Sequence, residues 1–188
     1  MWKNVLLLVT LLGFFSCNSE FSEKERQHYS DQGKEIAQAT FKALSSELMA
    51  QMKEGGPAQA IPFCNVQAVP LTKEISEKYN VIIKRTSDQL RSCNNEPSER
   101  EIDIIINYKQ LIAENKELKP IVEIDATNKK HFYAPIMMKA NCLVCHGKLK
   151  ETMSVQTDSI IKSIYQFDIA TGYVEGDLRG IWSIAFND

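Results

Sequence analysis

The chain has 188 residues, of which 44% are apolar, and this suits one globular domain with a buried core rather than a disordered or fibrous protein. Charged residues make up 24% of the chain and are mixed rather than blocked, with a formal net charge of −2. Such a balance gives no basic field that would attract phosphates, so we expect no nucleic-acid partner.

The N-terminal segment is typical of an export signal. A lysine precedes an apolar run over residues 5–15, which is shorter than the roughly 18 to 20 residues that span a bilayer. Cys17 follows Ser16 and resembles the lipidated cysteine of bacterial lipoproteins, although Phe14 stands where an aliphatic residue is usual. The alternatives are an ordinary secretory signal and an uncleaved anchor. We expect residues 1–16 to be a lipoprotein-type signal peptide.

This signal predicts where the folded part lies. It should be exported, should face the periplasm, and should be anchored to a bacterial membrane through a lipid on Cys17. Thiols outside the cytoplasm meet an oxidising environment in which disulfides persist. Disulfide bonds therefore have to be considered for the other four cysteines.

A long amphipathic helix is predicted over residues 22–52, because apolar residues recur there at three- or four-residue spacing. Two glycines and a proline at 55–57 end it. We interpret residues 17–57 as a helical arm that packs or acts as a spacer, in preference to a ligand role for His28.

A second helical segment covers residues 60–80, in which Pro70 is expected to cause a kink. Cys64 shares an apolar face with Ile61, so we expect its side chain to point at the core. Residues 81–87 have the β-branched composition of a strand, and loop composition follows.

Ser98 and Glu101 have the capping-box spacing and predict the start of a further helix. Residues 119–138 then predict two strands joined by a turn around Thr127 and Asn128.

The C-terminal part predicts a short helix over residues 154–165, a glycine-rich turn over 168–180, and a closing strand over 181–186. A few strands with intervening and flanking helices indicate the α+β class.

Between the hairpin and the short helix, Cys142, Cys145 and His146 form the pattern Cys-x-x-Cys-His, the attachment signature of c-type haem. Two thiols at this spacing match the two vinyl groups on one edge of the porphyrin, and the adjacent histidine ligates the iron from one side. Export supports this interpretation, because c-type haem is attached outside the cytoplasm. One motif predicts one haem c, covalently attached through Cys142 and Cys145.

Three alternatives to haem fit less well. A disulfide between Cys142 and Cys145 would close a tiny loop and leave His146 unexplained. A thioredoxin-like pair would open a helix in a βαβ context, which is only partly met. Zinc usually needs a second pair of ligands, and the chain has no second Cys-x-x-Cys or His pair.

The sixth position on the iron decides between electron transfer and ligand binding. Periodicity alone indicates that Cys64 is a buried core cysteine. Met137 and Met138 likewise look like strand residues that pack in the core. The candidates are His28, His131, Met137, Met138, Met153 and Cys64.

Five sequence elements stand in an order and spacing that can be compared with known families: "AIPFC", "VIIKRTS", "LRSCNNEPSERE", "HFYAPIMMKANCLVCHG" and "DIATGYVEGDLRG". Together they resemble a family of periplasmic single-haem c-type domains, a family of unknown function found as stand-alone exported proteins and as sensor domains of histidine kinases and chemoreceptors. The resemblance covers residues 22–186. It implies a PAS-like antiparallel sheet flanked by helices with a long N-terminal helix, and a PAS-like haem c domain over residues 58–188.

The resemblance also implies site residues. The cysteine of the first element, Cys64, is implied as the second axial ligand beside His146, and Arg85 and Arg179 as partners of the haem propionates. Solvated or fold-stabilising arginines are the alternative. Where the family usually has Asn and Pro, this chain has Ser92 and Cys93. The Cys93 thiol is therefore unexpected. It is either free or a second ligand candidate, and a bond between it and Cys64 would compete with haem ligation.

From these observations we expect an exported mono-haem module that responds to redox state or to a diatomic gas and is not an enzyme. A simple periplasmic electron-transfer cytochrome c is the alternative, and a haem peroxidase ranks last because no distal histidine is evident. The chain carries no kinase segment, so its signal should pass to a separate redox or signalling partner protein.

Overall fold

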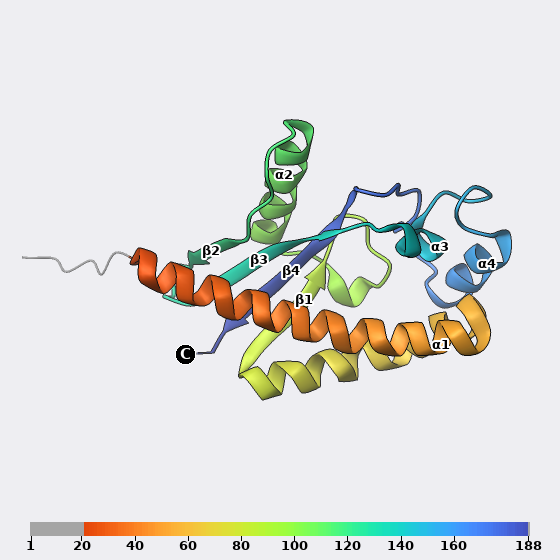
Figure 1. The fold of residues 1–188 in the computed structure, drawn as a ribbon, viewed down its shortest axis with the longest axis horizontal. Coiled ribbons are helices and arrows are strands. Elements are labelled where there is room, and N and C mark those ends of the chain that lie inside the picture. Colours follow the sequence, from red (N-terminus) through yellow and green to blue (C-terminus); the bar gives the residue numbers. More distant parts are fainter. Residues whose placement is uncertain (1–20, 188) are drawn as a thin grey trace, which may run out of the picture.

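The computed structural model describes residues 21–187, so the predicted signal peptide and Cys17 lie outside the described residues (Figure 1). Four strands form one antiparallel sheet in the order β1-β4-β3-β2. They are β1 (Val81–Thr86), β2 (Ile121–Ile124), β3 (Lys130–Met137) and β4 (Leu178–Phe186). With the helices described below, this confirms the predicted α+β class; the finer PAS-like description stays a prediction, as does the proposed division at residues 57 and 58.

The long helix α1 (Glu23–Tyr79) is a hairpin of two helical arms. Ser22 begins it with a capping box to Glu25, and the helical backbone angles break at Gly55 and Gly56. Gly56 has a φ of 63°, which glycine adopts without a Cβ penalty. The two arms lie side by side along one face of the sheet (Figure 1).

Pro70 lies inside the second arm with helical backbone angles, since only Gly55 and Gly56 have non-helical angles inside α1. The predicted kink at Pro70 stays a prediction. Proline removes the hydrogen bond to the carbonyl four residues earlier, which here belongs to Val66. Both Val66 and Pro70 are exposed, so water can bond to that carbonyl.

The two faces of the sheet carry separate apolar clusters. On one face the arms of α1 cover Phe132 and Ile184, with Gly33 directly against the ring of Phe132. On the other face α2 (Glu99–Ala113) packs Ile105 against Ile181. Alternation of side chains along β3 and β4 supplies both faces from the same strands.

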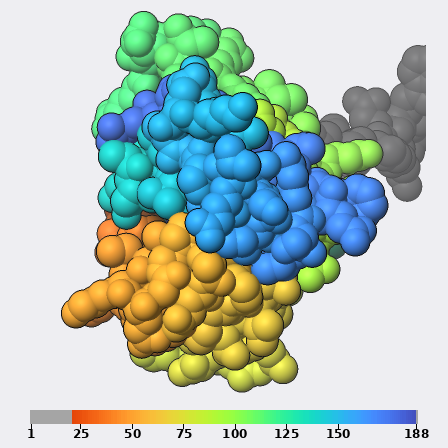
Figure 2. All heavy atoms as spheres, turned by 90° about the vertical axis from the view of Figure 1, so that its right-hand side faces the viewer, coloured from red at the N-terminus to blue at the C-terminus, as the bar shows by residue number. Residues whose placement is uncertain are grey.

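The Cys-x-x-Cys-His segment lies at the end of the sheet where the tip of the α1 hairpin turns (Figure 1). The chain leaves β3 and forms η2 (Ala140–Cys142), α3 (Leu143–His146) and then α4 (Val155–Ile164). The space-filling view from that end shows α4 and its neighbouring loops lying over the hairpin tip (Figure 2). No helix within residues 21–187 has the length and apolar character needed to cross a membrane.

Candidate haem-binding site

The motif forms a short helical turn that presents two thiols and an imidazole. Cys142 ends η2, whereas Cys145 and His146 belong to α3. The backbone N–H of Gly147 donates to the Leu143 carbonyl at 2.8 Å and closes the turn. Both thiols are free and half-buried. The predicted attachment residues therefore lie together, without the disulfide that was one alternative.

His146 has a defined ring orientation. Its Nδ1 lies 2.7 Å from the carbonyl oxygen of Ala170, and since that oxygen only accepts, Nδ1 carries the proton. The lone pair of Nε2 is therefore free to ligate a metal. The ring of Tyr173 meets the imidazole edge-on, with centroids 6.3 Å apart. Burial, with the charges of Arg91 and Arg179, holds the pKa of His146 well below its usual value, so the ring is neutral as a ligand must be.

Arg91 ties this helix to the loop before β4, a role that sequence analysis missed. Its Nη2 donates to the Cys145 carbonyl at 2.6 Å and to the Ala170 carbonyl at 3.3 Å. Its Nε lies 3.1 Å from Oδ1 of Asp168. Arg91 falls inside one of the quoted sequence elements, but an isolated arginine in a loop has no periodicity to mark it.

Arg85 and Arg179 bring positive charge to the same region. Arg85 lies over the ring of Trp182 at 6.0 Å, and Arg179 lies over Tyr173 at 5.6 Å and donates to the Gln89 carbonyl at 3.0 Å. Burial is the main cause that lowers the pKa of each guanidinium, and Arg179 adds to the effect on Arg85. Within residues 21–187 neither forms an ion pair with a carboxylate, so the region favours an anionic ligand.

Cys64 lies on the second arm of α1 and faces this charged region. Its side chain is half-buried rather than enclosed in the apolar core. Burial raises the pKa of the Cys64 thiol, and the charge of Arg85 opposes that shift. Cys64 also interacts electrostatically with Cys145 and Tyr165. The fold thus brings Cys64, predicted from the resemblance, close to the motif from a separate helix.

The other candidates for a sixth ligand lie in different settings. His28 is exposed on the first arm of α1, and His131 lies 2.9 Å from Asp125 near the β2–β3 turn. Met137 packs on the α2 side of the sheet. Met138 is buried with Tyr173, and Met153 with Ile61.

Cys93 also has a defined setting, in η1 (Cys93–Asn95). Its thiol is free and exposed, so Cys64 and Cys93 form no disulfide.

The arrangement fits a haem better than a bare metal ion. Among residues 21–187 no group of three His, Cys, Asp or Glu side chains converges to hold a metal. A porphyrin supplies four nitrogen ligands itself, so one imidazole and one thiol suffice from the protein. The two thiols, the free Nε2 of His146 and the two guanidiniums are groups of the kinds that a haem can bond to.

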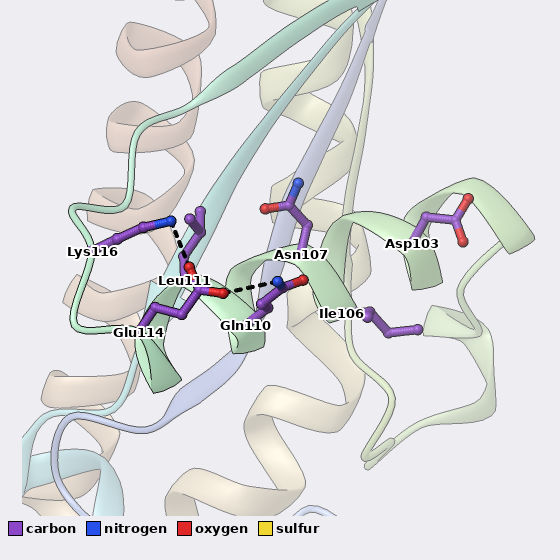
Figure 3. Close-up of a pocket in the computed structure, with 7 residues that line it drawn as sticks. All are labelled: Asp103, Ile106, Asn107, Gln110, Leu111, Glu114 and Lys116. Atoms are coloured by element: carbon purple, nitrogen blue, oxygen red, sulfur yellow. Dashed lines mark hydrogen bonds and ion pairs between the residues drawn. The ribbon is translucent and has the colours of Figure 1, made fainter.

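The surface has a hollow on α2, away from the motif, and another that borders the motif. The first, on the exposed side of α2, is lined by Asp103, Asn107, Glu114 and neighbours, and Gln110 and Lys116 both bond to the carboxylate of Glu114 there (Figure 3). The second lies between the hairpin tip at Pro57 and Val144 of the motif. The α2 hollow holds no cysteine or histidine, so we assign it no role in the site.

Comparison with known proteins gives two matches. A family model described as Tll0287-like matches residues 19–187. The structure is similar to the crystal structure of the cyanobacterial haem protein Tll0287, with a TM-score of 0.62 and 20% sequence identity over 88% of this chain and 96% of that chain. At this identity the structural likeness shows the fold alone. No curated protein matches the chain in sequence.

Proposed function

Because the chain belongs to the Tll0287-like family, we propose that it is an exported protein that binds one haem c covalently and responds to redox state or to a diatomic gas. The observation that carries the proposal is the 2.7 Å contact from Nδ1 of His146 to the Ala170 carbonyl, since it leaves Nε2 available as an iron ligand. The similar cyanobacterial structure is described as a haem protein, which supports the same ligand class.

The residues divide the binding task among them. Cys142 and Cys145 would form the thioether bonds, and His146 would supply one ligand to the iron. Cys64 would supply a second ligand, and Arg85 and Arg179 would bind the propionates. When bound, the haem supplies one-electron chemistry and an iron that accepts diatomic gases.

Cys64 suits a switch because of its place in the chain. It lies on the second arm of α1, and this arm leads through Tyr79 directly into β1. A change in how Cys64 is held would therefore move the arm relative to the sheet, and a two-state movement of this kind can be read by a partner protein. Arg85 favours the thiolate form of Cys64 through its positive charge.

The location belongs to the same proposal. A lipid on Cys17 would hold the domain at the outer face of a bacterial inner membrane or at another periplasm-facing surface, where haem attachment takes place. Mass spectrometry of the membrane fraction should find a diacylglycerol-modified N-terminal Cys17, and Cys17→Ser should release the protein. An unmodified chain in the soluble fraction would remove this part of the proposal.

The test of haem binding uses protein produced together with haem-maturation machinery. Intact mass should increase by one haem in the wild type and fail to increase when Cys142 and Cys145 are both replaced by alanine. Electron paramagnetic resonance of the ferric protein should give a low-spin signal of thiolate type that Cys64→Ala abolishes. The matched control is Cys93→Ala, because that thiol is exposed.

Two outcomes would change the proposal. A wild type without covalent haem would refute it. A low-spin signal that persists in Cys64→Ala would assign the sixth position to another side chain and favour a simple electron carrier with two fixed ligands.

A further inference from the structure

One peptide group links His146 to a buried ion pair. The carbonyl oxygen of Ala170 accepts from Nδ1 of His146 at 2.7 Å and from Nη2 of Arg91 at 3.3 Å. The N–H of the same residue donates to Oδ1 of Asp168 at 3.0 Å. The Ala170 carbonyl, which accepts from His146, is therefore shared with the guanidinium of Arg91. The residue is held at its carbonyl by Arg91 and at its N–H by Asp168.

The ion pair itself is well enclosed. The side chains of Arg91 and Asp168 are 15% and 2% exposed, and Nε lies 3.1 Å from Oδ1. Nη2 of Arg91 also donates to the Cys145 carbonyl at 2.6 Å. A planar guanidinium with several bonded acceptors has little freedom to move. Arg91 thus holds the backbone on both sides of the imidazole in one arrangement.

The shared carbonyl affects the electronic character of His146. A strong acceptor at Nδ1 draws the proton away from the ring and makes the imidazole a better electron donor to iron. A second donor on the same oxygen withdraws electron density from it and weakens it as an acceptor. Arg91 therefore limits the electron donation of His146, and this limit favours the reduced form of the iron.

We propose that Arg91 is a positioning residue that raises the reduction potential of the haem through the Ala170 carbonyl, with Asp168 moderating its charge. The inference rests on the proposed function, because it requires His146 to ligate a haem. Arg91 and Asp168 lie outside the proposed set of haem ligands. The inference predicts that substitutions of Arg91 and of Asp168 shift the reduction potential in opposite directions.

The signs follow from what each substitution leaves behind. Arg91→Gln removes the donor and the positive charge and leaves the buried carboxylate of Asp168 alone, so the potential falls. Asp168→Asn keeps an oxygen for the N–H of Ala170 but leaves the charge of Arg91 uncompensated, so the potential rises. Arg91→Lys keeps the charge without the fork, so its potential lies between those of the wild type and Arg91→Gln.

The experiment is a spectroelectrochemical titration of the haem-loaded proteins at fixed pH. We expect Arg91→Gln to change the equilibrium between oxidised and reduced forms by about tenfold, which is about 59 mV for one electron. Asp168→Asn should shift it in the other direction. Arg100→Gln is the matched control. Arg100, in the first turn of α2, pairs with Glu123 of β2, but its own side chain is 53% exposed, so solvent screens its charge.

Each outcome decides the matter. Unchanged potentials in the Arg91 and Asp168 variants, or shifts of the same sign in both, would overturn the inference. A pocket that is merely loosened by the substitutions gives no reason for the two potentials to shift in opposite directions. If Arg91→Gln does not fold, Arg91→Lys and Asp168→Asn give the same comparison. A wild type without covalent haem would refute the proposed function and this inference with it, whereas a loaded protein with unchanged potentials would refute the inference alone.

Discussion

Nζ of Lys84 lies 2.7 Å from Oε2 of Glu101, an ion pair that joins β1 to the first turn of α2. The carboxylate of Glu101 is 8% exposed. It also accepts from the backbone N–H of Ser98 at 2.8 Å as part of the capping box. The side chain of Ser183 on β4 also bonds to Glu101. The edge of the sheet and the start of the helix thus depend on one buried carboxylate and the donors around it.

Removal of Lys84 should therefore destabilise the fold. Lys84→Met leaves the carboxylate of Glu101 buried with one donor fewer, and we expect a loss of about 1 to 3 kcal/mol in the free energy of unfolding. Urea denaturation followed by circular dichroism measures it. The control is Lys119→Met, whose pair with Glu117 is exposed on both sides, so about 0.5 kcal/mol or less is expected there. Equal losses in both variants would contradict the prediction.

The same carboxylate predicts an acid dependence. Burial raises the pKa of Glu101, but the bonds from Lys84, Ser98 and Ser183 outweigh it, so the pKa is lowered overall. The ionised form then contributes stability above the unfolded pKa of about 4.3, and this contribution is lost as the pH falls through the folded value.

The measurement compares the wild type with Glu101→Gln by urea denaturation between neutral and acidic pH. The advantage of the wild type should be constant above about pH 5 and should shrink at lower pH as Glu101 becomes protonated. The exposed residue Glu47 provides the control, since Glu47→Gln should leave the pH dependence of the wild type in place. A difference that stays constant through the acidic range would refute the assignment.

The close approach of α1 to the sheet is specific to Gly33. A Cβ atom at this position would overlap the ring of Phe132, which is fully buried. Alanine favours helices over glycine by about 1 kcal/mol, yet overpacking costs about 1 to 3 kcal/mol, so we expect Gly33→Ala to be destabilising in net terms. Gln32→Ala, one residue away and exposed, should be neutral or slightly stabilising. Thermal melts of both variants measure these changes in stability, and a Gly33→Ala variant as stable as Gln32→Ala would contradict the prediction.

Arg85 gives a test that depends on haem. An unpaired guanidinium in a half-buried site is costly, so Arg85→Met should change the stability of the haem-free protein little or increase it. In the haem-loaded protein the same change removes a partner of a propionate and should cost about 1 to 3 kcal/mol. The readout is the effect of Arg85→Met on the free energy of unfolding, measured by denaturation in the haem-loaded and in the haem-free form. A variant effect that is the same in both forms would leave Arg85 without a role at the haem.

Much of the secondary structure could be predicted from local patterns. The capping box at Ser98 and Glu101 begins α2 as expected, and the break at Gly55 and Gly56 divides α1 into two arms. The predicted hairpin is formed by β2 and β3. These features depend on residues close in sequence, where backbone sterics and capping groups act without help from the rest of the chain. The resemblance of five elements to a haem-domain family is confirmed by the family match.

Other features required contacts between distant segments. Pro70 is accommodated inside the second arm because the carbonyl that its ring leaves without a helical partner belongs to the exposed residue Val66, and this exposure is a property of the packed helix. Free thiols at Cys64 and Cys93, which a sequence leaves open to pairing, also follow from where the two segments lie.

By itself the sequence determined the α+β class, the glycines that interrupt the long N-terminal helix, and the closeness of Cys142, Cys145 and His146 in one short helical turn, because spacing along the chain sets which thiols and imidazole lie together. Only the tertiary structure decided which groups surround that turn. Arg91 and Ala170 are 79 residues apart, and the shared carbonyl exists only because the loop before β4 folds back over α3. A hydrogen bond of this kind needs distance and direction in space, and neither is encoded in the local pattern of residues.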